Sequence, residues 1–153
     1  MKKNELFEEI DIEFESLHNV ECHVDELLQL AGSRAPSAIE KTAAGAFLSQ
    51  FYNGIENILK RFVKHLGDSM PAGDDWHIVL LNMFVDGSQS SMPVLFNNDQ
   101  KKELSDFRKF RHVFRNSYAH ELNWNRLKPG LEKMPGVLHG FEKRVRTALD
   151  ALT

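Results

Sequence analysis

Apolar side chains recur every three or four residues along most of the chain, and this spacing restricts the fold more than any other feature. The clearest run is Ala43, Phe47, Phe51, Ile55, Ile58, Phe62 and Leu66. On a helix of 3.6 residues per turn, these positions form one continuous stripe, which is the pattern of a helix buried on one side. No alternating pattern typical of strands occurs in the sequence. The sequence therefore predicts an all-α protein.

Two long helices with a short connection are predicted at the start of the chain. Residues 4–31 carry one apolar stripe and precede Gly32, which is a common residue just past a helix end. Ser37 is placed to cap the second helix, which Gly67 ends. Because the connection is short, we expect the two helices to be antiparallel and to form the centre of an up-down bundle of four to five helices.

The second half of the chain predicts a short helix and two longer ones. Residues 68–75 contain Pro71 and Gly73 and predict a loop, after which Asp74 or Asp75 is placed to cap a short helix that starts at Trp76. The serine-rich segment 87–96 is the most mobile one expected. A helix over 98–122 follows, and then a final helix from about residue 127. Pro129 fits its first turn, while Pro135 is expected to kink or split it.

Length and cysteine content agree with an intracellular protein of one domain. A chain of 153 residues is long enough for one sizeable core, and no linker divides it, so we expect a single domain over residues 1–153. Cys22 is the only cysteine, as expected in a reducing compartment. No apolar run is long enough for a transmembrane helix or a signal peptide. We therefore expect a cytoplasmic protein with no membrane partner.

Charge is unevenly distributed along the chain. Residues 1–31 hold nine acidic residues against two lysines, whereas residues 101–115 hold six basic residues against two acidic ones. The net charge of −3 argues against a protein that coats nucleic acid indiscriminately. The basic run is either a solvated helix face or a phosphate-binding surface, in which Arg108, Arg111 and His112 are the candidate contacts.

The basic run leads into the candidate site at residues 115–120, where Arg115 is followed five positions later by His120. Histidine exchanges a proton near neutral pH, and arginine presents a planar, permanently charged set of donors to phosphate oxygens. RNA cleavage through the 2′-hydroxyl needs both functions, because a proton must be removed and extra charge on the phosphate must be stabilised. Arg115 and His120 are therefore a candidate catalytic pair, and the alternative is a surface arginine that forms a salt bridge beside a histidine with no catalytic role.

The spacing of this pair has a geometric consequence. Five steps on a regular helix leave the two side chains roughly 140° apart, so they converge only if the arginine reaches round or if a second subunit completes the site. Asn116 and His120 are four residues apart and are expected to share a helix face. Asn116 is then placed to orient the imidazole. Tyr118 lies on the apolar stripe, which predicts a half-buried ring in the core or at an interface rather than a catalytic residue.

Several segments resemble successive helices of HEPN-domain proteins of the HepT-like branch. These segments are Ala46-Phe47-Leu48, Phe51-Tyr52-Asn53-Gly54-Ile55-Glu56-Asn57-Ile58-Leu59, Trp76-His77, the stretch from Phe107 to Asn116, and Asn123-Trp124. The order Arg115, Asn116, three residues and His120 is similar to the family's signature. The resemblance implies a helical bundle that forms homodimers, places this pair at the dimer interface and cleaves RNA with neither metal nor cofactor. It also implies a prokaryotic toxin paired with a nucleotidyltransferase antitoxin.

One feature of the family is missing from its usual position. HepT-type motifs continue after the histidine with one residue and a tyrosine, which in some systems the partner nucleotidyltransferase modifies with AMP. Here Glu121 and Leu122 follow His120. The resemblance therefore leaves the mode of regulation open.

Two other functions are compatible with the sequence. One is a catalytically silent HEPN module that binds a nucleotidyltransferase partner or RNA, and the other is a helical adaptor unconnected with RNA.

His18, Cys22 and His23 have a spacing that imitates a metal site, but no second pair of ligands completes it, and Cys22 is expected in the core.

Overall fold

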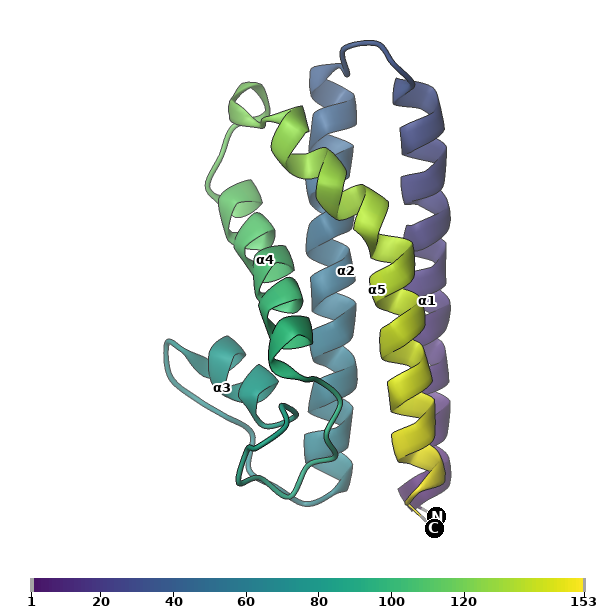
Figure 1. The fold of residues 1–153 in the computed structure, drawn as a ribbon, viewed down its shortest axis with the longest axis vertical. Coiled ribbons are helices and arrows are strands. Elements are labelled where there is room, and N and C mark those ends of the chain that lie inside the picture. The colour runs from purple at the N-terminus through teal and green to yellow at the C-terminus, as the bar shows by residue number, and fades with distance from the viewer. Residues whose placement is uncertain (1, 153) are drawn as a thin grey trace.

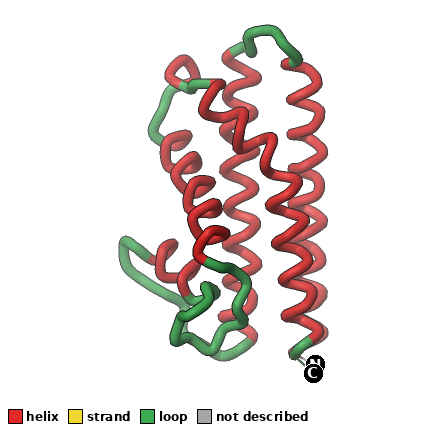
Figure 2. The backbone as a smooth tube through the Cα atoms, in the orientation of Figure 1, coloured by secondary structure: helices red, strands yellow, loops and turns green. Residues whose placement is uncertain are grey.

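The computed structural model describes residues 2–152, which form a bundle of helices (Figures 1 and 2). Its elements are α1 (Lys2–Ala31), α2 (Ala38–His65), α3 (Trp76–Asn82), α4 (Asn98–Arg115), the 3₁₀ helix η1 (Ala119–Glu121) and α5 (Trp124–Asp150). No β-strand is formed within the described residues, apart from one isolated bridge between Val85 and Phe96. The predicted all-α fold is confirmed. No helix among these elements is both long and apolar enough to cross a membrane.

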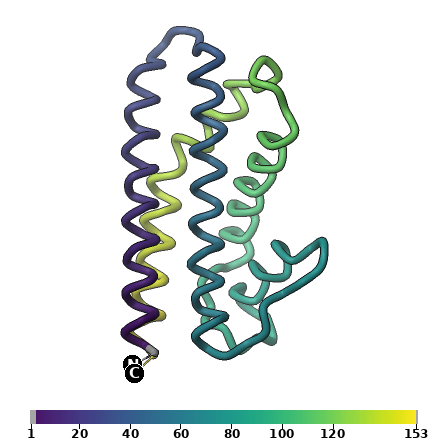
Figure 3. The backbone as a smooth tube through the Cα atoms, turned by 180° about the vertical axis from the view of Figure 1, so that it is seen from behind, coloured from purple at the N-terminus to yellow at the C-terminus, as the bar shows by residue number. Residues whose placement is uncertain are grey.

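Helices α1 and α2 run antiparallel along the full length of the bundle, as Figure 3 shows. Gly32 ends α1 with a φ of 52°, a conformation that glycine adopts without strain. Ser37 caps α2, because its hydroxyl accepts a hydrogen bond from the Glu40 N–H while the Glu40 carboxylate accepts one from the Ser37 N–H. Arg34 also donates two hydrogen bonds to that carboxylate. The Arg34 guanidinium and the Ser37 N–H together lower the pKa of Glu40 to about 2.

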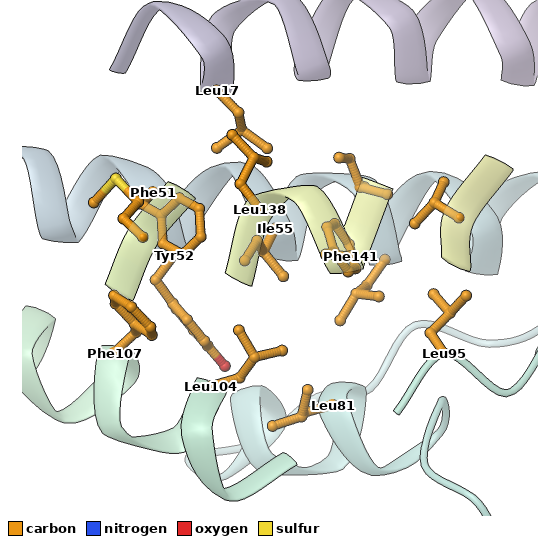
Figure 4. Packing of buried hydrophobic residues seen from close by; sticks show 14 of the residues in the cluster. Leu17, Phe51, Tyr52, Ile55, Leu81, Leu95, Leu104, Phe107, Leu138 and Phe141 are labelled. Carbon is orange, nitrogen blue, oxygen red and sulfur yellow. The ribbon is translucent and has the colours of Figure 1, made fainter. Parts of the chain in front are cut away.

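Contact between α1 and α2 depends on Gly54. A methyl group on this residue would lie 2.5 Å from a Leu17 methyl carbon, so the two helices approach closely only because α2 has no side chain there. Leu17 is 1% exposed and has no open space into which to move. The core continues into α5, which contributes Phe141 (Figure 4). This ring packs against Phe14 of α1 and stacks on Phe96.

The short helix α3 starts where predicted, but by a different mechanism. Asp75 precedes it, yet neither Asp74 nor Asp75 caps it through a side chain. Instead, the Asp75 carbonyl accepts hydrogen bonds from the N–H groups of Ile78 and Val79. The segment after α3 closes on itself, because the Leu95 and Phe96 N–H groups both donate to the carbonyl of Phe84, just beyond the end of the helix.

Helices α4 and α5 differ from the sequence prediction at their boundaries. Helix α4 ends at Arg115 rather than near residue 122, and Leu122 still reaches the core, at 6% exposure. The sequence pattern did not predict the end of α4 at Arg115, because the apolar spacing continues through the turn that follows. Helix α5 begins at Trp124, so Pro129 lies beyond its first turn. Pro135 does not split α5, which instead changes direction along its length (Figure 1).

Gly54→Ala is expected to lower the free energy of unfolding by about 1–3 kcal/mol, because the added methyl group overlaps Leu17 in a filled core. The matched control is Gly136→Ala in α5, where an added Cβ meets no atom within 4 Å. That change should stabilise the protein by about 0.5–1 kcal/mol through helix propensity. Urea unfolding of both variants measures the difference. Equal effects at the two glycines would contradict the close approach of α1 and α2.

Candidate functional site

Arg115 and His120 lie on either side of a helix end. Arg115 is the last residue of α4, and His120 is in the middle of η1, so they do not belong to one regular helix. Both side chains are exposed. Within residues 2–152, neither makes a side-chain hydrogen bond or an ion pair. The 140° separation expected on a continuous helix therefore does not apply, and both groups are open to a ligand.

The Asn116 side chain caps the end of α4 and makes no hydrogen bond to His120. Its side-chain amide donates a hydrogen bond of 2.8 Å to the carbonyl of His112. This carbonyl belongs to the last turn of the helix, where backbone acceptors lack partners within the helix. Asn116 and His120 do not share a helix face, because α4 has already ended. The expected orientation of the imidazole by Asn116 is thus not formed in this structure.

The turn that carries His120 is held by Glu121. The Tyr118 N–H donates a hydrogen bond of 2.8 Å to the Glu121 carboxylate, and the Glu121 N–H donates one of 2.9 Å to the Tyr118 carbonyl. The Tyr118 and His120 rings are nearly parallel, with an interplanar angle of 7° and centroids 5.9 Å apart. Tyr118 is 76% exposed in the single chain, so the prediction of a half-buried core ring was wrong, while its place at an interface stays a prediction. Its position in the turn, rather than on a helix, explains the difference.

The three predicted phosphate contacts have different environments. His112 is exposed and Arg108 is half-buried on α4, where both remain accessible. Arg111 is only 4% exposed and forms an ion pair with Glu56 of α2, with a nitrogen to oxygen distance of 2.8 Å. A guanidinium buried and paired in this way is not placed to bind an RNA phosphate. We therefore remove Arg111 from the candidate RNA contacts.

Arg111 instead belongs to a buried polar cluster, formed by Asn53, Glu56, His77 and Arg111, that joins α2, α3 and α4. The guanidinium donates to the Asn53 side-chain oxygen as well as to Glu56. His77 Nδ1 lies 2.5 Å from the second carboxylate oxygen of Glu56. Since a carboxylate only accepts hydrogen bonds, we assign the Nδ1 proton to His77, which donates it to Glu56. The Arg111 Nη2 lies 2.9 Å from the same nitrogen and contacts it without a hydrogen bond in this protonation state. Both oxygens of Glu56 are thereby satisfied.

Sequence reasoning missed this cluster, although one signal was present. Glu56 occupies the buried side of α2, four residues after Tyr52 and three before Leu59. A carboxylate within an apolar stripe requires a buried partner, because an isolated ionised group is too costly to remove from water. The signal does not identify the partner. Arg111 is 55 residues away, and its position in a basic run favoured a solvent-facing assignment.

The ring of Tyr52 packs against the Arg111 side of the cluster. The Arg111 guanidinium lies 4.9 Å above the centre of its ring, a favourable cation–π distance. The Tyr52 hydroxyl points toward Leu104 in Figure 4 and has no hydrogen-bond partner within the described residues. Burial is the largest cause of its raised pKa, and the nearby Glu56 carboxylate adds to it. Tyr52 is a fully buried residue of the core, away from the exposed Arg115 and His120.

The C-terminal end of α4 is positioned by direct contact with the backbone of α2. An added Cβ at Gly45 would overlap the ring of Phe114. Phe114 immediately precedes Arg115, so this glycine determines how closely the helix end approaches α2. On another side of α4, Phe107, Phe110, Val113, Leu122 and Leu127 line a groove of about 330 Å³ between α4 and the start of α5. The turn with His120 thus leads directly into this groove through Glu121 and Leu122.

The histidines and cysteine of α1 have other neighbours. His18 Nε2 lies 2.7 Å from a Glu142 carboxylate oxygen of α5, and His23 stacks on Phe47. Cys22 is exposed, so its predicted place in the core was wrong. Within residues 2–152, no three His, Cys, Asp or Glu side chains are grouped in a way that would hold a metal ion.

Comparison with known families gives one match. The family described as HepT-like protein matches residues 43–152, which is more than half of the chain and includes α3, α4, η1 and α5. Helix α1 lies outside the matched region. Neither curated proteins nor solved structures gave a match.

Glu56→Gln is expected to lower the free energy of unfolding by about 3–5 kcal/mol, because it leaves the buried Arg111 charge without a counter-charge. Glu9→Gln is the matched control, since Glu9 pairs with Arg61 and His65 in more exposed positions. Its cost should stay near 1 kcal/mol or below. Replacing both partners, as in Glu56→Leu with Arg111→Met, should recover much of the loss. Similar costs for Glu56→Gln and Glu9→Gln in urea unfolding would contradict this role.

Proposed function

Because the chain belongs to the HepT-like family, we propose that it is a metal-independent endoribonuclease, the toxin of a prokaryotic toxin–antitoxin system, and that it acts in the cytoplasm. Arg115 and His120 are the proposed catalytic residues. One observation carries the proposal. Both side chains are exposed beside one helix end, and no residue within 2–152 occupies their polar atoms with a hydrogen bond or ion pair.

The proposed reaction is attack by the substrate's own 2′-hydroxyl group. His120 takes the proton from that hydroxyl as the bond from the 2′-oxygen to phosphorus forms. Arg115 stabilises the additional negative charge on the phosphate oxygens. The bond from phosphorus to the 5′-oxygen then breaks, and the leaving oxygen receives a proton. The products are a 2′,3′-cyclic phosphate and a 5′-hydroxyl group, so water is not consumed in this step.

A homodimer supplies what one chain lacks in this scheme. The attacking and leaving oxygens lie on opposite sides of phosphorus in an in-line displacement, so one fixed imidazole reaches both only by moving. Two copies related by a twofold axis bring together two Arg115 and two His120 side chains. One imidazole then serves as the base and the other as the acid.

Phosphate binding is assigned to the face of α4 that precedes the site. Arg108 and His112 remain accessible there, and His112 is close in sequence to Arg115. The overall charge of −3 means that attraction of RNA depends on this local cluster rather than on the whole surface. Binding should therefore weaken as the salt concentration rises.

A cognate nucleotidyltransferase-type antitoxin is the proposed protein partner. The alternative function is a catalytically silent HEPN module that binds this partner or RNA. One observation favours it, because the expected contact between Asn116 and His120 is absent and the Asn116 amide caps α4 instead. The two functions differ in one respect. Only the ribonuclease requires the His120 imidazole for growth inhibition, while both retain partner binding in His120→Ala.

His120→Ala and Arg115→Ala should each lower the rate of RNA cleavage by about 100-fold or more, as expected when a proton-transfer or charge-stabilising group is removed. The assay uses purified protein and labelled RNA in excess chelator. His139→Ala is the matched control, because His139 is also an exposed histidine but lies on α5. It should cleave RNA at the unaltered rate.

Two outcomes would contradict the ribonuclease. One is a wild-type protein that does not cut RNA in chelator, and the other is unchanged cleavage by His120→Ala. Circular dichroism of each variant shows whether the helical fold is retained. If His120→Ala inhibits growth as strongly as the wild-type chain while binding the partner, the silent module replaces the ribonuclease as the proposed function.

A further inference from the structure

We propose that Tyr118 receives an unpaired nucleobase next to the scissile phosphate, and that the substrate class is therefore single-stranded RNA. This inference rests on the proposed function, because it concerns the RNA that the site at Arg115 and His120 binds. It adds a specificity-determining residue, and the motif of arginine and histidine contains no such role for an aromatic ring.

Exposure distinguishes Tyr118 from every other aromatic residue that the structure describes. Its side chain is 76% exposed, whereas the phenylalanine, tryptophan and remaining tyrosine residues within 2–152 are buried or half-buried. The other strongly exposed large hydrophobic residues in this range are aliphatic or methionine. Core packing therefore does not account for this ring. A flat, accessible ring offers the surface on which a nucleobase stacks.

The turn holds the ring in place before any ligand binds. The backbone of Tyr118 is fixed by two hydrogen bonds with Glu121, one in each direction. The ring itself lies nearly parallel to the imidazole of His120. Because the backbone that carries the ring is already ordered, less conformational freedom is lost on binding and more of the stacking free energy contributes to affinity.

Proximity to the proposed catalytic histidine determines which base is bound. The Tyr118 and His120 ring centroids are 5.9 Å apart, so a base on Tyr118 belongs to a nucleotide that adjoins the phosphate beside His120. Such a base must be free of its own neighbours to present a face to the ring. Bases in a duplex are stacked on one another and do not meet this condition.

The first experiment measures binding to RNA that cannot be cleaved. The probes are a short single-stranded RNA with 2′-O-methyl groups throughout, which lacks the attacking hydroxyl, and the same sequence as a duplex. Tyr118→Ala should bind the single strand about 5–150-fold more weakly, the range expected for loss of one stacked base. Tyr118→Phe keeps the ring and should bind like the wild type. Val94→Ala removes another exposed side chain, 60% exposed, and should also bind like the wild type.

The second experiment removes bases from the RNA instead of the ring from the protein. Single abasic sites are placed at each position of the same 2′-O-methyl strand, and binding is measured for the wild type and Tyr118→Ala. One position should weaken binding to the wild type but not to Tyr118→Ala, because the same contact is already lost. The proposal is overturned if every position affects both proteins alike. That pattern is expected if Tyr118 acts only through contact with a second copy of the chain.

These results are separable from the fate of the ribonuclease. If the wild type cuts RNA and Tyr118→Ala binds and cuts equally well, the stacking role fails while the ribonuclease stands. If the wild type cuts no RNA but binds the single strand through Tyr118, the ribonuclease fails while the stacking role stands. Tighter binding of the duplex than of the single strand would also overturn the proposal.

Discussion

The buried ion pair between Glu56 and Arg111 is the interaction on which the arrangement of the second half of the bundle depends. Desolvating both charges is costly, and the cost is offset only when each group also has its hydrogen bonds. Asn53 and His77 supply these, so residues of α2, α3 and α4 must all be in place together. Apolar contacts alone tolerate sliding between helices, whereas this cluster allows one relative position of α2 and α4.

The fold followed from local patterns because local physics determines most of it. The stripe along α2, the capping by Ser37 and the glycine after α1 each act within a few residues, and all were readable in the sequence. The positions at which the helices end depend on contacts between residues farther apart in the sequence. Asn116 and Ser117 favour local hydrogen bonds over helix continuation, yet the apolar spacing to Leu122 predicted a longer α4. Leu122 enters the core after a turn. The apolar periodicity is the same whether the helix continues to Leu122 or ends before it, so it does not distinguish the two structures.

The site was predictable in its residue types but not in its geometry. The motif indicates Arg115 and His120 as the proposed catalytic residues, because a guanidinium stabilises charge and an imidazole transfers protons. Their surroundings depend on tertiary contacts that no short pattern encodes. Arg111 and Arg115 are one helical turn apart in the same basic run, so the sequence alone gives no reason to expect one to be buried and the other exposed. Arg111 meets α2 and α3, whereas the helix end that carries Arg115 extends past α3 in Figure 1.

The early end of α4 changes what a second subunit has to contribute. On one continuous helix, Arg115 and His120 point in directions roughly 140° apart, and a partner would be needed simply to bring an arginine to a histidine. The turn at residues 116–118 replaces that continuous helix, so the separation of roughly 140° no longer describes how the two side chains are placed. The remaining requirement is chemical. In the proposed reaction, proton removal and proton donation occur on opposite sides of phosphorus, so the His120 imidazole of a second copy is the group that we expect the homodimer to add.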